Sequence, residues 1–124
     1  MKDESKLYLL HVVDILAFNE GIDTMAKQVL NEETTNQLKT KLIECIPKEI
    51  RSDMEVETLV VQGIPFAEII SIAKKNRVDM IVMGSHGRTG IAHIMLGSVS
   101  EKVVRKAPCP VLTVRQTGHK FVMP

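Results

Sequence analysis

The sequence predicts one α/β domain with an open, mainly parallel sheet and flanking helices. Short apolar runs alternate along the chain with stretches whose apolar residues recur at helical spacing. The runs are continuous rather than alternating, which is typical of strands covered on both faces. At 124 residues and 44% hydrophobic content, the chain is long enough for one buried core. Strand–helix alternation in this order implies parallel strands joined by right-handed crossovers.

The first half of the chain predicts two strands around one long helix. Leu7–Val13 is apolar apart from His11 and favours a strand covered on both faces. A helix is expected from an N-cap at Asp23 to about Ile46, with Pro47 ending it or starting the exit loop. The stretch 56–61 is the second expected strand.

The second half predicts two further strands, each preceded by a helix. Gly63–Pro65 opens a helix with proline at its first position, and Asn76–Arg77 ends it. Met80–Met83 is the third expected strand. A final helix leads through Glu101–Lys106, and Val111–Val114 is the fourth strand.

A glycine-rich stretch follows the third expected strand. Gly84 and Gly87 are separated by two residues, and nine residues then separate Gly87 from Gly97-Ser98. Ligands of parallel sheets bind beyond the carboxyl ends of the strands. Glycine lets the backbone approach an anion closely, and the first amides of a helix point at it. The stretch lacks the Walker lysine and the G-x-G-x-x-G pattern, and on its own it is also compatible with simple tight turns.

The spacing G-x2-G-x9-G-S resembles the nucleotide motif of the universal stress protein family. Further stretches look like family signatures and occur in family order, namely 10–14, 73–75, 79–90, 97–103 and 107–114. The resemblance extends to Arg115, so we expect a domain over residues 1–115 and a C-terminal tail over 116–124.

The resemblance implies a fold of the adenine nucleotide alpha-hydrolase-like, Rossmann-like type in a cytoplasmic, usually dimeric protein. Members with this motif bind ATP, and Mg is expected with it. The phosphates would be surrounded by glycines and the start of the last helix, and Val12 matches a position near the adenine. The matched residues of the phosphate site are Gly84, Gly87, Gly97 and Ser98, with the backbone amides of Val99 and Ser100.

Three charged or titratable residues of the motif are ambiguous. Arg88 suits a phosphate contact or a solvated loop, and His86 suits a phosphate bond or simple loop packing. The carboxylate of Glu101 opposes an anion near the helix start. A capping box between Ser98 and Glu101 would turn that carboxylate back toward its own backbone.

The N-terminus departs from the family pattern. The resemblance implies a first, central strand, which carries an aspartate that contacts adenine, and a helix after it. We expect these two elements to have no counterpart here, and therefore expect four strands. A gap between Leu7–Val13 and Met80–Met83 would bury unpaired backbone groups. Either these strands pair directly, or another chain supplies a strand, or the sequence is incomplete. Our hypothesis is a rearranged sheet or one completed by another chain.

Composition argues against several other classes of protein. With 16 basic and 15 acidic residues and 3% aromatics, no drive toward nucleic acid or anionic membranes is expected. There is no apolar run of membrane-spanning length and no signal-peptide core. Cys45 and Cys109 have no metal spacing and are expected to be small buried hydrophobes in a reducing cytoplasm.

Catalysis has little support in the sequence. No nucleophile–histidine–acid order or metal cluster is evident, so at most slow ATP hydrolysis is expected. Histidines outside the glycine stretch are interpreted as packed or solvated, namely His11, His93 and His119. Nucleotidyl transferase and ATP pyrophosphatase motifs are absent.

Two function classes follow. The first is an ATP-binding regulatory protein of the stress response. The second is a non-nucleotide-binding, dimeric interaction module that has lost the adenine half of the pocket. The phosphate motif favours the first, and the absent N-terminal unit favours the second. In either class a homodimer through the apolar edge strand Val111–Val114 is expected.

Overall fold

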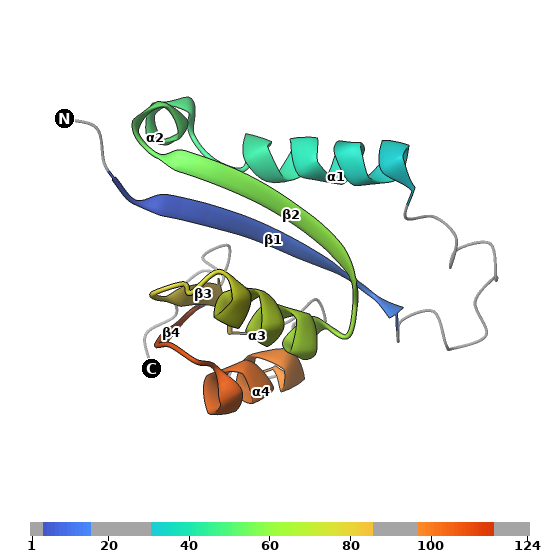
Figure 1. Cartoon of the computed structure of the whole chain (residues 1–124), viewed down its shortest axis with the longest axis vertical. Helices are drawn as coiled ribbons and strands as arrows, with labels where there is room; N and C mark the ends of the chain where they lie inside the picture. The colour runs from blue at the N-terminus through green and yellow to red at the C-terminus, as the bar shows by residue number, and fades with distance from the viewer. Residues whose placement is uncertain (1–3, 16–30, 86–96, 116–124) are drawn as a thin grey trace, which may run out of the picture. The chain divides into compact units, whose positions relative to one another are not determined.

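The structure is a computed structural model that describes residues 4–15, 31–85 and 97–115 (Figure 1). The chain divides into two compact units, Met1–Pro65 and Phe66–Pro124. The first contains β1 (Lys6–Asp14), α1 (Glu32–Glu44), α2 (Lys48–Asp53) and β2 (Glu55–Gly63). The second contains β3 (Ile81–Gly84), α4 (Ser98–Lys106) and β4 (Val111–Val114), and α3 (Pro65–Lys75) leads into it. The predicted α/β class is confirmed.

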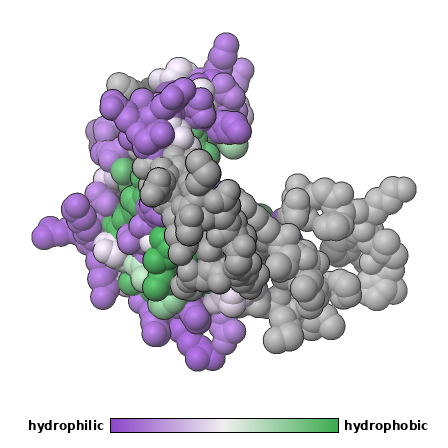
Figure 2. Space-filling model, turned by 90° about the vertical axis from the view of Figure 1, so that its right-hand side faces the viewer, coloured by the Kyte–Doolittle hydropathy of each residue, from purple (hydrophilic) through white to green (hydrophobic). Residues whose placement is uncertain are grey.

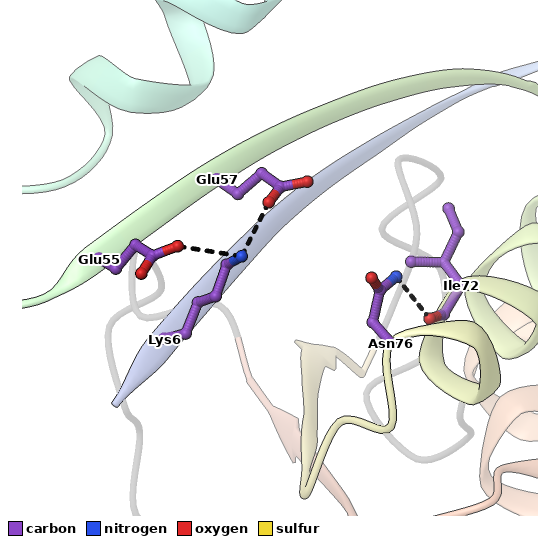
Figure 3. Close-up of polar contacts among 5 residues, drawn as sticks. All are labelled: Lys6, Glu55, Glu57, Ile72 and Asn76. Carbon is purple, nitrogen blue, oxygen red and sulfur yellow. Dashed lines mark hydrogen bonds and ion pairs between the residues drawn. The ribbon is translucent and has the colours of Figure 1, made fainter. Parts of the chain in front are cut away.

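The first unit is built on a long parallel strand pair. β1 and β2 pair over nine residues each, from Lys6 opposite Glu55 to Asp14 opposite Gly63. Ion pairs pin the start of this ladder, because Lys6 Nζ lies 3.0 Å from Glu55 Oε2 and 2.9 Å from Glu57 Oε1 (Figure 3). These contacts raise the pKa of Lys6 far above its ordinary value, the hydrogen bond to Glu57 contributing most.

The helices of the first unit differ from the prediction. α1 begins at Glu32 behind an N-cap at Asn31, whereas the expected cap Asp23 lies outside the described residues. A second helix, α2, was not predicted. Pro47 occupies its N-cap position, so this proline starts a helix as well as following one.

Cys45 is also placed differently from the prediction. It is exposed, while Cys109 is half-buried. The expectation of two buried thiols is therefore wrong for Cys45. Because α1 ends at Glu44, Cys45 falls at the C-cap rather than on the inward stripe of the helix, and its thiol donates to the carbonyl oxygen of Lys41 at 3.3 Å.

In the second unit, α3 begins and ends as its sequence predicts. Pro65 is its first residue, where a missing N–H costs nothing. At the other end, Asn76 Nδ2 donates to the Ile72 carbonyl oxygen at 2.9 Å (Figure 3), and Arg77 adopts a positive φ of 50°. Lys102 of α4 lies over the Phe66 ring, with Nζ 4.8 Å from the ring centroid, so the two helices are neighbours in this unit.

The strand pair of the second unit is short and parallel. β3 and β4 pair from Ile81 opposite Val111 to Gly84 opposite Val114. One face of this pair keeps large apolar side chains exposed, since Val82 is 61% and Leu112 53% exposed. Figure 2 shows hydrophobic side chains, in green, between hydrophilic ones on the face that it displays. Met80, expected at the start of the third strand, lies just before it.

The described strands form two separate two-stranded sheets, β1–β2 and β3–β4. β1 and β3 belong to different units, so the alternative in which the first and third strands pair directly stays a prediction. No helix in the three described ranges is long and apolar enough to cross a membrane.

Candidate functional site

Hydrogen bonds connect the end of β3 with the start of α4. The Ser85 N–H donates to the Val114 carbonyl oxygen at 2.9 Å, which extends the β3–β4 ladder by one residue. The Ser85 carbonyl oxygen accepts from the Gly97 N–H at 2.8 Å. One residue earlier, the Gly84 carbonyl oxygen accepts from the Ser100 hydroxyl at 2.7 Å. The exit of β3 therefore holds the first turn of α4 at two points.

The first turn of α4 has no side-chain cap. Its N-cap is Gly97, which offers no side-chain acceptor, and the Glu101 N–H is the first to bond back, to the Gly97 carbonyl oxygen at 2.9 Å. Among the residues that the structure describes, nothing accepts from the amides of Ser98, Val99 and Ser100. Unsatisfied amides at a helix start carry a partial positive charge and attract anions.

The backbone conformation at position 97 does not require glycine. Its φ of −63° and ψ of 159° are extended values open to any residue. What glycine contributes here is the absence of a side chain beside the free amides. Ser98 next to it is exposed, whereas Ser100 is only 3% exposed. The two hydroxyls of this turn therefore face different surroundings.

The predicted capping box between Ser98 and Glu101 is wrong. Ser98 is the first helical residue rather than the cap. Glu101 does not reach back to the helix start, because its Oε1 accepts from Arg105 Nη2 at 2.8 Å, one turn further along α4. The ion pair at i, i+4 directs this carboxylate along the helix and offsets its charge.

The structure brings together five of the predicted site residues in the second unit, namely Gly84, Gly97, Ser98, Val99 and Ser100. Val12 lies half-buried in β1 of the first unit, opposite Val61. Three further predicted residues, His86, Gly87 and Arg88, lie outside the described residues.

Sequence reasoning missed Ser85. This residue is 7% exposed and uses both its backbone groups to connect β4 with the start of α4. The signal in the sequence that could have indicated Ser85 was its position, as a small polar residue directly after the glycine that ends a strand. No group of three or more histidine, cysteine or acidic side chains in the described ranges is placed to hold a metal ion.

Comparison with known proteins identifies the family. A sequence model of the universal stress protein family matches residues 2–115. The chain belongs to the universal stress protein family. The family resemblance that was inferred from the glycine motif is thereby confirmed.

Named relatives agree with this assignment. Universal stress protein MJ0577 of Methanocaldococcus jannaschii is 39% identical over 127 residues, which covers 90% of this chain and 77% of that protein. Universal stress protein YxiE of Bacillus subtilis is 38% identical over 88 residues, covering 68% of this chain and 60% of the relative.

Solved structures of the family share the fold. A structure of hypothetical protein MJ0577 aligns with a TM-score of 0.75 at 36% identity, covering 94% of this chain and 80% of that one. Universal stress protein UspA from Lactobacillus plantarum aligns with a TM-score of 0.67 at 25% identity, covering 90% and 78%. Because the family match starts at residue 2 and the relatives cover about 90% of the chain, the expectation of a missing first strand is not confirmed.

Proposed function

We propose that this universal stress protein binds ATP and that the first turn of α4 holds the phosphates. The observation that carries the proposal is the group of free amides at Ser98, Val99 and Ser100, beyond the carboxyl end of a parallel strand. Several amides and a helix dipole hold a polyphosphate without a catalytic lysine. The family motif, G-x2-G-x9-G-S, ends at Ser98, the first of these residues.

The residues present suit a phosphate chain. Gly84 and Gly97 add no side chain next to the turn, and the exposed hydroxyl of Ser98 adds a donor. Glu101 is held by Arg105 instead of facing the amides, which lowers its repulsion toward an anion. Gly97 acts through its lack of a side chain, since its own N–H is bonded to Ser85.

The remaining contacts come from the motif. His86, Gly87 and Arg88 would complete the loop around the phosphates, and Val12 would lie near the adenine. Mg²⁺ would be held mainly by phosphate oxygens and water, as is usual for nucleotide-bound magnesium. ATP occupancy would then regulate the state of a dimer or the choice of a partner, with no more than slow hydrolysis.

Mass spectrometry of nucleotide released from the purified protein, paired with calorimetric titration of MgATP, tests the proposal. Gly84→Val adds a branched side chain at the last residue of β3, whose carbonyl oxygen bonds the first turn of α4, and β-branched residues are favoured in strands. The matched control is Gln62→Val, an exposed position next to the last residue of β2. We expect binding to be lost only in Gly84→Val. Equally poor binding by wild type and Gly84→Val would overturn the proposal in favour of a non-nucleotide interaction module.

We further propose a homodimer through the edge strand Val111–Val114. Among the described residues of the second unit, β4 pairs with β3 alone, and Leu112 and Val114 are 53% and 43% exposed. An apolar edge of this kind favours pairing with a second copy. Light scattering should give a dimer mass for the wild type at micromolar concentration and a monomer mass for Leu112→Lys. A monomeric wild type would contradict this assembly.

A further inference from the structure

We infer that Ser100 is a positioning residue of the phosphate site, and that its hydroxyl fixes the first turn of α4 rather than touching the ligand. The inference rests on the proposed function for its ligand. The structural role of Ser100 does not depend on the ligand, because it rests on the hydrogen bond of 2.7 Å from Ser100 Oγ to the Gly84 carbonyl oxygen.

The inward orientation of Ser100 separates it from the other serine of the turn. Ser100 is 3% exposed and Val103, three residues along α4, is fully buried at 0%, so both lie on the buried face of the helix. A serine hydroxyl has one proton to donate. As that proton goes to Gly84, the hydroxyl has none left for a phosphate oxygen, whereas the exposed Ser98 does.

Two hydrogen bonds on consecutive carbonyl groups make the attachment rigid. The Ser85 carbonyl oxygen accepts from the Gly97 N–H at 2.8 Å, and the Gly84 carbonyl oxygen accepts from Ser100 Oγ. The donors are separated by almost one helical turn. A single bond would let the turn pivot about it, and a second bond at this spacing prevents the pivot. We call this pair of bonds the strand–helix clasp.

The clasp contributes to binding through preorganisation. Amides that already point toward the phosphate position lose little freedom when the ligand arrives. The Ser100 hydroxyl also satisfies the carbonyl oxygen of Gly84, whose negative end lies beside the helix start and would otherwise oppose an anion. Ser100 thus aims the amides of Ser98 and Val99 and removes a source of repulsion.

Four variants test the inference: Ser100→Ala, Ser100→Cys, Ser100→Thr and Ser98→Ala. Ser100→Ala removes the donor, Ser100→Cys retains a weak donor of similar size, and Ser100→Thr restores the hydroxyl. Ser98→Ala is the matched control on the exposed side. Amide hydrogen exchange of α4 is measured without nucleotide, and affinity is measured by MgATP titration.

The clasp predicts a distinct pattern of results. In Ser100→Ala without nucleotide, the first protected amides of α4, from Glu101 onward, should exchange hydrogen about tenfold faster than in the wild type. The same variant should bind MgATP about tenfold more weakly. Both changes are of the size expected for one lost buried hydrogen bond. Ser100→Thr should restore both, and Ser100→Cys should lie between. Ser98→Ala should weaken binding while leaving exchange unchanged. If Ser100→Ala fails to fold, the comparison of Ser100→Cys with Ser100→Thr decides.

Failure of the inference and failure of the proposed function are distinguishable. Unchanged exchange in Ser100→Ala would overturn the clasp, whatever the nucleotide does. Faster exchange with unchanged MgATP affinity would overturn the positioning role. Faster exchange in a protein whose wild type binds no MgATP would support the clasp as the device that fixes the turn and reject the proposed ligand.

Discussion

The first turns of α1 and α4 differ in whether a side chain caps their backbone N–H groups. At α1, Asn31 Oδ1 accepts from the Thr34 N–H at 2.8 Å, and two glutamates in the first turn complement the dipole. At α4, glycine stands at the N-cap, no side-chain cap forms, and the acidic Glu101 is drawn toward Arg105. A side chain caps one amide of the first helix, whereas the described first turn of the fourth helix has no such cap, which is why we propose it as the anion site.

The two units show the same contrast on a larger scale. In the first, side chains stabilise the start of a helix, where Asn31 is the cap, and the start of a strand, where Lys6 forms ion pairs. In the second, backbone groups and the Ser100 hydroxyl connect a short strand pair to α4. Side-chain caps favour stability at the cost of a free binding surface. Variants that exchange the two arrangements therefore test the assignment directly.

The largest effect is expected when α4 receives a cap of its own. Gly97→Asp places a carboxylate that can accept from the amides of the first turn, the groups proposed to hold phosphate. The free energy of unfolding should rise by a few tenths of a kcal/mol, up to about 1 kcal/mol, while MgATP binding falls by about a hundredfold or more. Urea unfolding and calorimetry on the same preparation measure both.

Gly97→Ala is the matched control for this swap. The backbone at Gly97 is compatible with alanine, so the fold should persist, with a stability loss of about 1 kcal/mol from the poorer cap. Binding should weaken less than in Gly97→Asp. If Gly97→Asp binds MgATP as tightly as the wild type does, the amides of α4 are not the phosphate site.

A smaller effect is expected from releasing Glu101. In Arg105→Ala the carboxylate loses its partner at 2.8 Å and becomes free to approach the helix start. MgATP affinity should fall severalfold at low salt and recover toward the wild-type value at high salt, since the effect is electrostatic and this surface is exposed. The double variant Glu101→Gln/Arg105→Ala should bind at least as well as the wild type. Loss of affinity in the double variant would show that Arg105 acts in another way.

The cap of α1 should affect stability alone. Asn31→Ala removes the acceptor of the Thr34 N–H and should lower the free energy of unfolding by about 1 kcal/mol. MgATP affinity should not change, because α1 contributes no proposed ligand group. Denaturant unfolding and calorimetry give the two values. A change in affinity equal to that of a Gly97 variant would remove the contrast between the two helix starts.

The strands were the most predictable part of the fold. Continuous apolar runs locate all four described strands to within a residue or two, and Val111–Val114 matches its element end to end. Helix starts were harder, because a cap depends on backbone geometry that a sequence only suggests. Asn31 and Gly97 hold the caps that the sequence analysis placed at Asp23 and Ser98, although asparagine caps helices about as well as aspartate and serine do.

At the candidate site, the sequence pointed to residues that lie together but did not predict their hydrogen bonds. The motif spacing selected Gly84, Gly97 and Ser98, which the structure places at the end of β3 and the start of α4. It did not reveal that the Gly97 amide is already bonded to Ser85, nor that the Ser100 side chain faces inward. Both facts depend on the pairing of β3 with β4 and on which face of α4 is buried. These tertiary features are not encoded in the local pattern.

The smallest predicted effect concerns pH and the start of β1. The hydrogen bonds to Glu57 and Glu55 raise the folded-state pKa of Lys6 above its ordinary value of 10.5. A raised pKa gives a contribution to stability that is complete below the unfolded value and is lost as pH rises through the folded one. The side chains are partly exposed, so salt screens the effect. The difference in unfolding free energy between wild type and Lys6→Met should stay constant from neutral pH to about pH 9 and shrink above the ordinary lysine pKa. Urea titrations across this range at low salt measure it. A difference that grows in alkali would mean that the ion pairs do not hold the ladder start.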